Sequence, residues 1–321
     1  MFDFFGRPGL ISIAILIALS PSPALAWPER TVRLLTPFGA GGGSDAIARI
    51  IADQLSKRWH QPVIIENKPG ADGILAISDF LQSRDPHNLL FTFTSAVTVN
   101  PIIHLHLPYN PAELLPISPV VDGIITVVTN PATKIESLAE LVEAAKAMPG
   151  MLNFATVPGG GHFGFIDFQR RSGISLTLVP YRNPIASVTD LLENRIQFAV
   201  MPLSTVLAHV QAGKLKLLCV ASDKRAPTVP EVPTTREAGA AEFRVMGGLG
   251  LFANRESPLD QREKIARDII EIVQDPDVSG RITTLGELPR SATPKEFEKI
   301  LAEQTAWYAN LAAANGIKPQ P

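Results

Sequence analysis

Short apolar runs with a β-strand pattern alternate with amphipathic helical stretches along this chain. The series begins with TVRLLTPF, SDAIARIIADQLSKRW, PVIIEN, DGILAISDFLQS and NLLFTFTS. Each helix in such a series supplies the crossover between two parallel strands, so the alternation predicts βαβ units on parallel sheets. The first helix carries one continuous apolar stripe, formed by Ile47, Ile50, Ile51 and Leu55. Its expected N-cap is Ser44.

A second series of the same kind follows the proline-rich segment LPYNPAELLPISP. It repeats the architecture of the first, with a glycine loop, VPGGGH, between a strand and a helix. We therefore predict an α/β protein of two lobes that face a cleft, each a mainly parallel sheet flanked by helices. Lobe 1 is expected to comprise residues 27–123 and 247–321, and lobe 2 residues 124–246. Strands 123–130 and 247–254 are the expected hinge crossings, about which one lobe closes on the other.

The N-terminus has the pattern of a secretory signal. Arg7 precedes the apolar run 10–19, and small residues follow at Ala24 and Ala26. The run is much shorter than the roughly 20 residues of a membrane-spanning helix, although a retained anchor is the alternative interpretation. We predict a signal peptide at 1–26 that is cleaved after Ala26, and a periplasmic mature chain without membrane insertion.

Composition excludes several function classes. The formal charge is −2, from 29 basic and 31 acidic residues without a cationic run, which argues against nucleic acid or an anionic membrane surface as partner. The single cysteine, Cys219, excludes an internal disulfide and is expected to pack in a strand. His104 and His106 lack further ligands at metal-binding spacing, and no nucleophile motif is present. We expect no catalytic residue, metal or cofactor.

The first glycine loop, GAGGGS, leads from a strand into a helix N-terminus. Such a loop presents several backbone N–H groups to one point, where the helix dipole adds positive potential, so it can hold an anion. Gly41, Gly42 and Gly43 remove side chains that would keep a ligand away. A plain flexible connection is the alternative. A P-loop would need Lys where Ser44 and Asp45 stand, and a dinucleotide loop would need a third glycine at Ser44. A carboxylate fits better.

The second glycine loop offers a similar set of donors. Gly159, Gly160 and Gly161 supply backbone amides, with the Thr156 hydroxyl and His162 nearby. Two such loops on facing lobes would hold a small molecule with acidic or otherwise polar ends. Charge-assisted hydrogen bonds of about 1.5 to 3 kcal/mol each allow micromolar or tighter binding from three or four contacts.

The sequence resembles the solute-binding proteins of tripartite tricarboxylate transporters, also called Bug receptors. The N-terminal signature is the loop PF-x-x-GGG-[ST]-D followed by QPV-x-x-EN-x-PG. Further matches follow in order along the mature chain: NP, LPY, VPY, AGKLK, S-x-KR, VPT, EAG and GLFA. The glycine loop alone would not be specific, but this ordered combination is.

The resemblance implies a type II periplasmic binding protein, or Venus flytrap, that closes on a small carboxylate and presents it to integral-membrane permease subunits. It also implies which residues hold the carboxylate. In lobe 1 these are Phe38, Gly41, Gly42, Gly43, Ser44, Asp45, Thr94 and Ser95. In lobe 2 they are Thr156, Gly160, His162 and Tyr181. We expect a monomer without a cofactor.

The chain departs from the family pattern at three places. The second glycine loop is shorter and lacks hydroxyl residues, and Arg182-Asn183-Pro184 follows VPY. Gln197 and Met201 stand where many members end a strand with an acidic residue. The ligand, a mono-, di- or tricarboxylate, is therefore expected to lack an ammonium group and to place an apolar or aromatic body against Met201 and Phe163. A ligand sensor for a membrane signalling partner and a secreted enzyme on this scaffold are the alternative functions.

Overall fold

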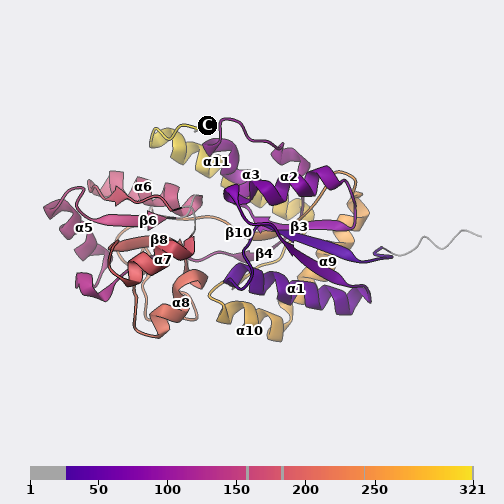
Figure 1. Cartoon of the computed structure of the whole chain (residues 1–321), viewed down its shortest axis with the longest axis horizontal. Helices are drawn as coiled ribbons and strands as arrows, with labels where there is room; N and C mark the ends of the chain where they lie inside the picture. Colours follow the sequence, from indigo (N-terminus) through magenta and orange to yellow (C-terminus); the bar gives the residue numbers. More distant parts are fainter. Residues whose placement is uncertain (1–26, 157–158, 182–183, 242, 320–321) are drawn as a thin grey trace, which may run out of the picture.

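The computed structural model describes residues 27–156, 159–181, 184–241 and 243–319, and these form two α/β lobes, each built on its own sheet (Figure 1). Lobe 1, on the right of Figure 1, has strand order β11-β4-β10-β3-β1-β2, and lobe 2, on the left, has order β7-β6-β8-β5-β9. The predicted two-lobed α/β architecture is confirmed. The predicted signal peptide, residues 1–26, lies outside the described residues.

Lobe 1 contains both ends of the described chain. Its strands are β1 (Val32–Thr36), β2 (Val63–Asn67), β3 (Asn88–Phe93), β4 (Leu115–Asp122), β10 (Gly248–Ala253) and β11 (Leu288–Pro289). Its α-helices are α1 (Gly43–Trp59), α2 (Ile74–Ser83), α3 (Ser95–Thr98), α4 (Asn100–Ile103), α9 (Leu259–Gln274), α10 (Pro276–Thr284) and α11 (Pro294–Ala314). Short 3-10 turns at Ala71–Gly73 and Pro111–Glu113 complete it.

Lobe 2 is the segment between β4 and β10. Its strands are β5 (Ile125–Thr129), β6 (Asn153–Thr156), β7 (Thr177–Leu178), β8 (Phe198–Pro202) and β9 (Lys216–Val220). Its helices are α5 (Leu138–Ala147), α6 (Gly160–Ser172), α7 (Pro184–Leu192) and α8 (Leu203–Gln211), with a 3-10 turn at Pro131–Thr133.

Both sheets are mixed, with the parallel strands grouped together. In lobe 1, β1 pairs parallel with β2 and β3, whereas β10 is antiparallel to β3 and β4. In lobe 2, β6 pairs parallel with β7 and β8, whereas β5 is antiparallel to β8 and β9. The βα units predicted from sequence form the parallel parts, and the strands next to the lobe crossings supply the antiparallel parts.

The chain passes between the lobes at two adjacent points. β4 ends in the first sheet and β5 begins in the second, with only Gly123 and Ile124 between them. The Gly123 N–H donates to the Gly247 carbonyl at 2.9 Å, so the two crossings lie side by side. A Cβ at Gly248 would overlap the Val121 carbonyl, so only glycine allows this close approach. The expectation that strands 123–130 and 247–254 themselves cross was wrong, because β5 and β10 each lie within one sheet.

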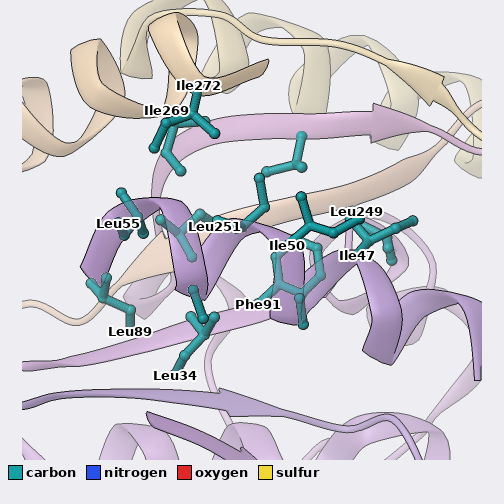
Figure 2. Close-up of a cluster of buried hydrophobic side chains, with 14 of the residues drawn as sticks. Leu34, Ile47, Ile50, Leu55, Leu89, Phe91, Leu249, Leu251, Ile269 and Ile272 are labelled. Atoms are coloured by element: carbon teal, nitrogen blue, oxygen red, sulfur yellow. The ribbon is translucent and has the colours of Figure 1, made fainter. Parts of the chain in front are cut away.

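The core of lobe 1 lies between its sheet and helices α1 and α9 (Figure 2). Ile47 and Leu55 from the predicted stripe of α1 are fully buried against strand residues such as Leu34, Phe91 and Leu251. The opposite face of the sheet is covered too, since Leu35, Leu90 and Phe252 pack with α2 and α11. Burial on both faces holds the carboxyl ends of β1 and β3 in fixed positions.

Helix α11 spans the two lobes. It begins with a capping box at Thr293 and packs Phe297 against Phe252 of β10, with ring centroids 5.3 Å apart. Farther along, Tyr308 packs edge-to-face on Phe163 of α6, and Asn315, just after the helix, donates to Asp167 of α6 at 3.1 Å. Figure 1 shows the C-terminal end of α11, in yellow, above α6. Residues 294–315, expected in lobe 1 alone, therefore contact both lobes.

In the described ranges, no helix combines the length and the apolar character that crossing a bilayer would require.

Candidate functional site

Four strand-to-helix junctions approach one another where the lobes meet. β1 leads into α1 and β3 into α3 in lobe 1, while β6 leads into α6 and β8 into α8 in lobe 2. β1 and β3 are parallel neighbours, as are β6 and β8, so the helices of each pair start at the same edge of their sheet. None of these four described helices has a side-chain hydrogen bond at its N-cap. The first amides of α1, α3 and α6 are therefore available to a ligand, whereas the Leu203 amide at the start of α8 donates to the Ile124 carbonyl at 2.7 Å.

Two close contacts define how these helix starts face each other. A Cβ at Gly43 of α1 would lie 3.0 Å from the Ser204 Cβ of α8. A Cβ at Gly159, before α6, would lie 4.0 Å from the Ser95 Cβ of α3. The structure thus pairs α1 with α8 and α3 with α6 across the lobe interface. The start of a helix of several turns carries roughly half a positive charge, so α1 and α6 favour an anion between the lobes, while the short α3 contributes only its free amides.

Asp45 holds the first glycine loop in shape from the inside. Its side chain is almost fully buried and accepts the Gly41 N–H at 2.9 Å and the Asn67 amide at 2.8 Å. Arg49, one turn later, donates to both carboxylate oxygens at 2.8 and 3.2 Å. Burial alone would raise the pKa of Asp45, but the hydrogen bonds from Arg49, Gly41 and Asn67 lower it below its ordinary value. Asp45 was expected to contact the ligand, but the chain itself occupies its carboxylate.

Asn67, the last residue of β2, is a loop anchor whose role the sequence did not reveal. Besides Asp45, its side-chain amide donates to the Phe38 carbonyl at 3.0 Å. Asn67 thereby ties both ends of the first glycine loop to the neighbouring strand. Asn67 belongs to the EN pair of the family motif, but no spacing rule connects that pair to Asp45, 22 residues earlier in the chain.

The loop leaves open space where a side chain at Gly42 would stand. Gly42 is the N-cap of α1 with an extended backbone, so the predicted N-cap Ser44 was wrong and lies inside the first turn. A Cβ at Gly42 would meet nothing nearer than the Gly39 carbonyl at 3.8 Å. The first intrahelical bond comes from Ala46, which leaves the Gly43 and Ser44 amides without helical partners.

The second glycine loop is backed by α11. A Cβ at Gly160 would overlap the Tyr308 hydroxyl, which bonds to the backbone of Met246. His162 lies in the first turn of α6, where burial lowers its pKa, so the imidazole is held neutral. Thr156 ends β6 next to residues 157–158, which lie outside the described ranges.

Thr94 and Ser95 follow β3 at the lobe interface. Thr94 is buried, and its hydroxyl accepts the Gly248 amide at 3.3 Å beside the crossing. Ser95 opens α3 and is the residue opposite Gly159. Of these two expected ligand residues, Ser95 faces the second lobe directly, whereas Thr94 holds the junction of β3 and β10.

Three other expected contacts lie elsewhere. Met201 and Phe163 are each only 1% exposed and belong to packed clusters, so the expectation that they form the apolar wall of the site was wrong. Tyr181 donates its hydroxyl to Asp190 at 2.6 Å. Burial and the Asp190 carboxylate raise the pKa of Tyr181 to about 12. Its hydroxyl is thus already engaged within lobe 2.

Phe93 provides an apolar surface that the sequence analysis did not identify. It ends β3, one residue before Thr94, and its side chain is 40% exposed. Its ring packs edge-to-face on Phe38 of the first glycine loop, with centroids 4.8 Å apart. An exposed aromatic ring beside the uncapped start of α1 is suited to the apolar part of a carboxylate ligand.

The described part of the chain contains no group of three or more His, Cys, Asp or Glu side chains placed to hold a metal ion.

Comparisons with known proteins extend over both lobes. The family model described as the tripartite tricarboxylate transporter family receptor matches residues 47–317. Protein BugT of Bordetella pertussis is 30% identical over 313 residues, or 96% of each chain. The solved structure of the periplasmic binding protein BugD has a TM-score of 0.82 and 26% identity, covering 92% of this chain and 100% of that one. MatC from Rhodopseudomonas palustris with bound malate has a TM-score of 0.79 and 26% identity, covering 89% and 99%.

Proposed function

Because this chain belongs to the family of tripartite tricarboxylate transporter receptors, we propose that it captures a small carboxylate between its lobes and delivers it to a membrane permease. The family consists of periplasmic solute receptors rather than enzymes. The observation that carries the proposal is that three helix starts without side-chain caps, those of α1 and α3 in lobe 1 and of α6 in lobe 2, lie at the lobe interface. Backbone amides at such ends bind carboxylates without a cationic side chain.

We assign the carboxylate to the Gly42–Gly43–Ser44 amides of lobe 1 and to Ser95, with Gly160 and His162 opposite. Asp45 and Asn67 position the first loop, and Thr94 supports the junction beside it. Neutral His162 can donate a hydrogen bond through one ring nitrogen, which suits a ligand oxygen. These residues lie at the starts of α1, α3 and α6. The start of α8 is not part of the assignment, because Ser204 there packs against Gly43.

The proposed ligand is a carboxylate without an ammonium group and with an apolar segment against Phe93. Gln197 stands near the strand end where the family pattern often has an acidic residue. Its side-chain oxygen accepts the Asn153 amide at 2.9 Å, so the glutamine serves lobe 2 itself. The likeness to MatC, whose structure contains malate, supports a dicarboxylate among the candidates. Phe93 favours members with several methylene groups or an aromatic ring.

A melting assay with a panel of carboxylates tests this proposal. Acetate, benzoate, malate, adipate and citrate would be compared, with aspartate as the amino-bearing counterpart of malate. A ligand at about 100 times its Kd adds about 2.7 kcal/mol of stability and raises Tm measurably. If no carboxylate raises Tm, the proposed function is wrong.

The Gly42→Leu variant tests where the carboxylate binds. Gly42 has an ordinary extended backbone and open space in front of it, so leucine fits the fold but fills the place of the anion. We expect loss of at least about tenfold in affinity, or 1.4 kcal/mol, with Tm of the free protein nearly unchanged. The matched control is Gly280→Leu, at an exposed helical position with equally open space. Equal affinity in both variants would refute the assignment.

The permease partner and the export route are further parts of the proposal. Residues 1–26 are proposed to direct secretion, with Trp27 as the first mature residue. Mass spectrometry of the secreted protein tests the cleavage point. Deleting the receptor and measuring carboxylate uptake tests delivery, and measuring induction of the transport genes in the same strain tests the sensor alternative.

A further inference from the structure

Glu287 is a buried carboxyl group at the lobe interface that the proposed binding site does not use. It lies between α10 and β11 in lobe 1 and is 5% exposed. Its Oε1 accepts the Ser204 hydroxyl of lobe 2 at 2.7 Å. Its Oε2 is buried and has no hydrogen bond of normal geometry among the described residues, although the Ile124 amide lies close enough to lower the pKa of the carboxyl group. A buried carboxylate with one unpaired oxygen is costly, whereas the protonated acid is less so.

Ser204 links this carboxyl group to the first glycine loop. Gly43, the first residue of α1, lies against it: a Cβ added at Gly43 would be 3.0 Å from the Ser204 Cβ. Gly286, next to Glu287, lies against the start of α8: a Cβ added at Gly286 would be 3.3 Å from the Ser204 amide nitrogen. Lobe 1 therefore contacts the start of α8 from two sides, through α1 and through the 286–287 turn.

The charges around Glu287 do not neutralise it. Asp122 of β4 acts on it from the crossing and raises its pKa further. Arg290, the nearby cation, donates to both oxygens of Asp122 at 2.8 Å and is thus engaged. Asp223 of lobe 2 in turn raises the pKa of Asp122 and forms an ion pair with Arg244 at 3.4 Å. On the crossing side, Gly123 brings only backbone, with its Cβ position 3.7 Å from Oε2.

We propose that Glu287 is a positioning residue for ligand capture: as the lobes close, it takes up one proton from solvent and holds Ser204, with the start of α8, against the first glycine loop. This inference rests on the proposed capture of a carboxylate between the lobes. Opening separates Ser204 from Glu287 and returns the carboxyl group to water, where it releases the proton.

The direction of the pH dependence follows from burial. Burial raises the pKa of Glu287 to about 7 from 4.5, against the lowering effects of the Ser204 hydroxyl and the Ile124 amide. Closure is therefore fully favoured below the ordinary value of 4.5 and becomes less favourable as pH rises through 7. Within that window, the ratio of closed to open protein falls by up to about tenfold per pH unit.

Small-angle X-ray scattering of the ligand-free protein tests the coupling directly. We expect the radius of gyration of the wild type to increase between about pH 5 and pH 8, as closed protein opens. Glu287→Gln imitates the protonated acid and should stay compact at both pH values. Ser204→Ala removes the contact and should open at lower pH than the wild type. Glu298→Gln, an exposed glutamate of α11, is the matched control and should follow the wild type.

Circular dichroism confirms that each variant is folded. A radius of gyration that is independent of pH, or that changes alike in the wild type and Glu287→Gln, contradicts the coupling. Calorimetry with malate and adipate then separates the two proposals. Proton uptake on binding near pH 6 should disappear in Glu287→Gln. If the wild type and Glu287→Gln bind a carboxylate with the same proton uptake, only the role of Glu287 is refuted. If the radius of gyration depends on pH but no carboxylate binds, only the proposed function is refuted.

Discussion

Asp45 organises the first glycine loop from within. The composition of the loop predicts amides that can reach an anion, but it does not tell which of them the chain uses itself. The Gly41 amide donates to the Asp45 carboxylate, which also accepts hydrogen bonds from Arg49 and Asn67. That side-chain direction depends on the burial of the first turn against β2, which a local motif does not specify. The amides of Gly43 and Ser44 remain available at the helix start, where the sequence placed them.

Replacing Asp45 by Asn should loosen this loop. The variant loses the charge-assisted bonds to Arg49 and leaves buried donors without a full partner, so we expect a loss of about 1 to 3 kcal/mol in unfolding free energy. Asp53→Asn is the matched control, since Asp53 pairs with Lys57 at the same helical spacing on the exposed side of α1. Its expected cost is below about 0.5 kcal/mol. Urea unfolding of both variants is the measurement, and equal losses would show that Asp45 has no special role.

At the scale of elements, the βα units were predictable because each carries its own periodic pattern. The stripe on α1 predicted the buried face that the structure shows. The strands at the crossings were less predictable, since an apolar run such as GIITVVTN fits equally well in either sheet. The four-residue helices α3 and α4 are too short to produce a period. The contact of α11 with α6 depends on tertiary packing alone, so no sequence signal placed that helix across both lobes.

Tyr308 tests the role of α11 as the link between lobes. Its hydroxyl accepts the Met246 N–H at 3.0 Å and donates to the Met246 carbonyl. Tyr308→Phe leaves both partly buried backbone groups of Met246 without this partner, so we expect a Tm loss that corresponds to about 1 to 3 kcal/mol. Tyr181→Phe removes a hydroxyl that bonds to Asp190 at a less buried position and should cost less. Calorimetric melting of both variants is the check. An unchanged Tm in Tyr308→Phe would mean that packing with Phe163, rather than hydrogen bonding, fastens α11.

For the whole molecule, the two-lobed fold was predictable because the resemblance extends along most of the chain. The relative placement of the lobes was not. It depends on contacts such as Ser204 with Gly43 and Glu287, which join positions about 80 to 160 residues apart. Likewise, Phe93 could not be distinguished in sequence from Phe91, which lies on the same strand and is fully buried. Exposure at the end of a strand depends on where the opposite lobe stands.

Cys219 reports on the integrity of lobe 2. The thiol is fully buried in β9, and burial raises its pKa to about 12 despite a hydrogen bond to the backbone of Val127. A thiol reagent should therefore modify the folded protein only when lobe 2 opens. A bound carboxylate should slow the modification by a factor of about 1 + [L]/Kd, because capture requires an intact lobe 2. Immediate modification of the folded protein, at the rate seen in denaturant, would contradict this.

The side-by-side crossings at Gly123 and Gly247 make lobe 2 an insertion whose two ends emerge at one point. An inserted unit with adjacent ends can be exchanged for that of a relative without stretching the host sheet. Chimeric receptors that combine lobe 1 of this protein with lobe 2 of a relative, joined at these glycines, should therefore fold. Comparing the ligand preference of each chimera with those of its two parents would show which lobe determines ligand specificity.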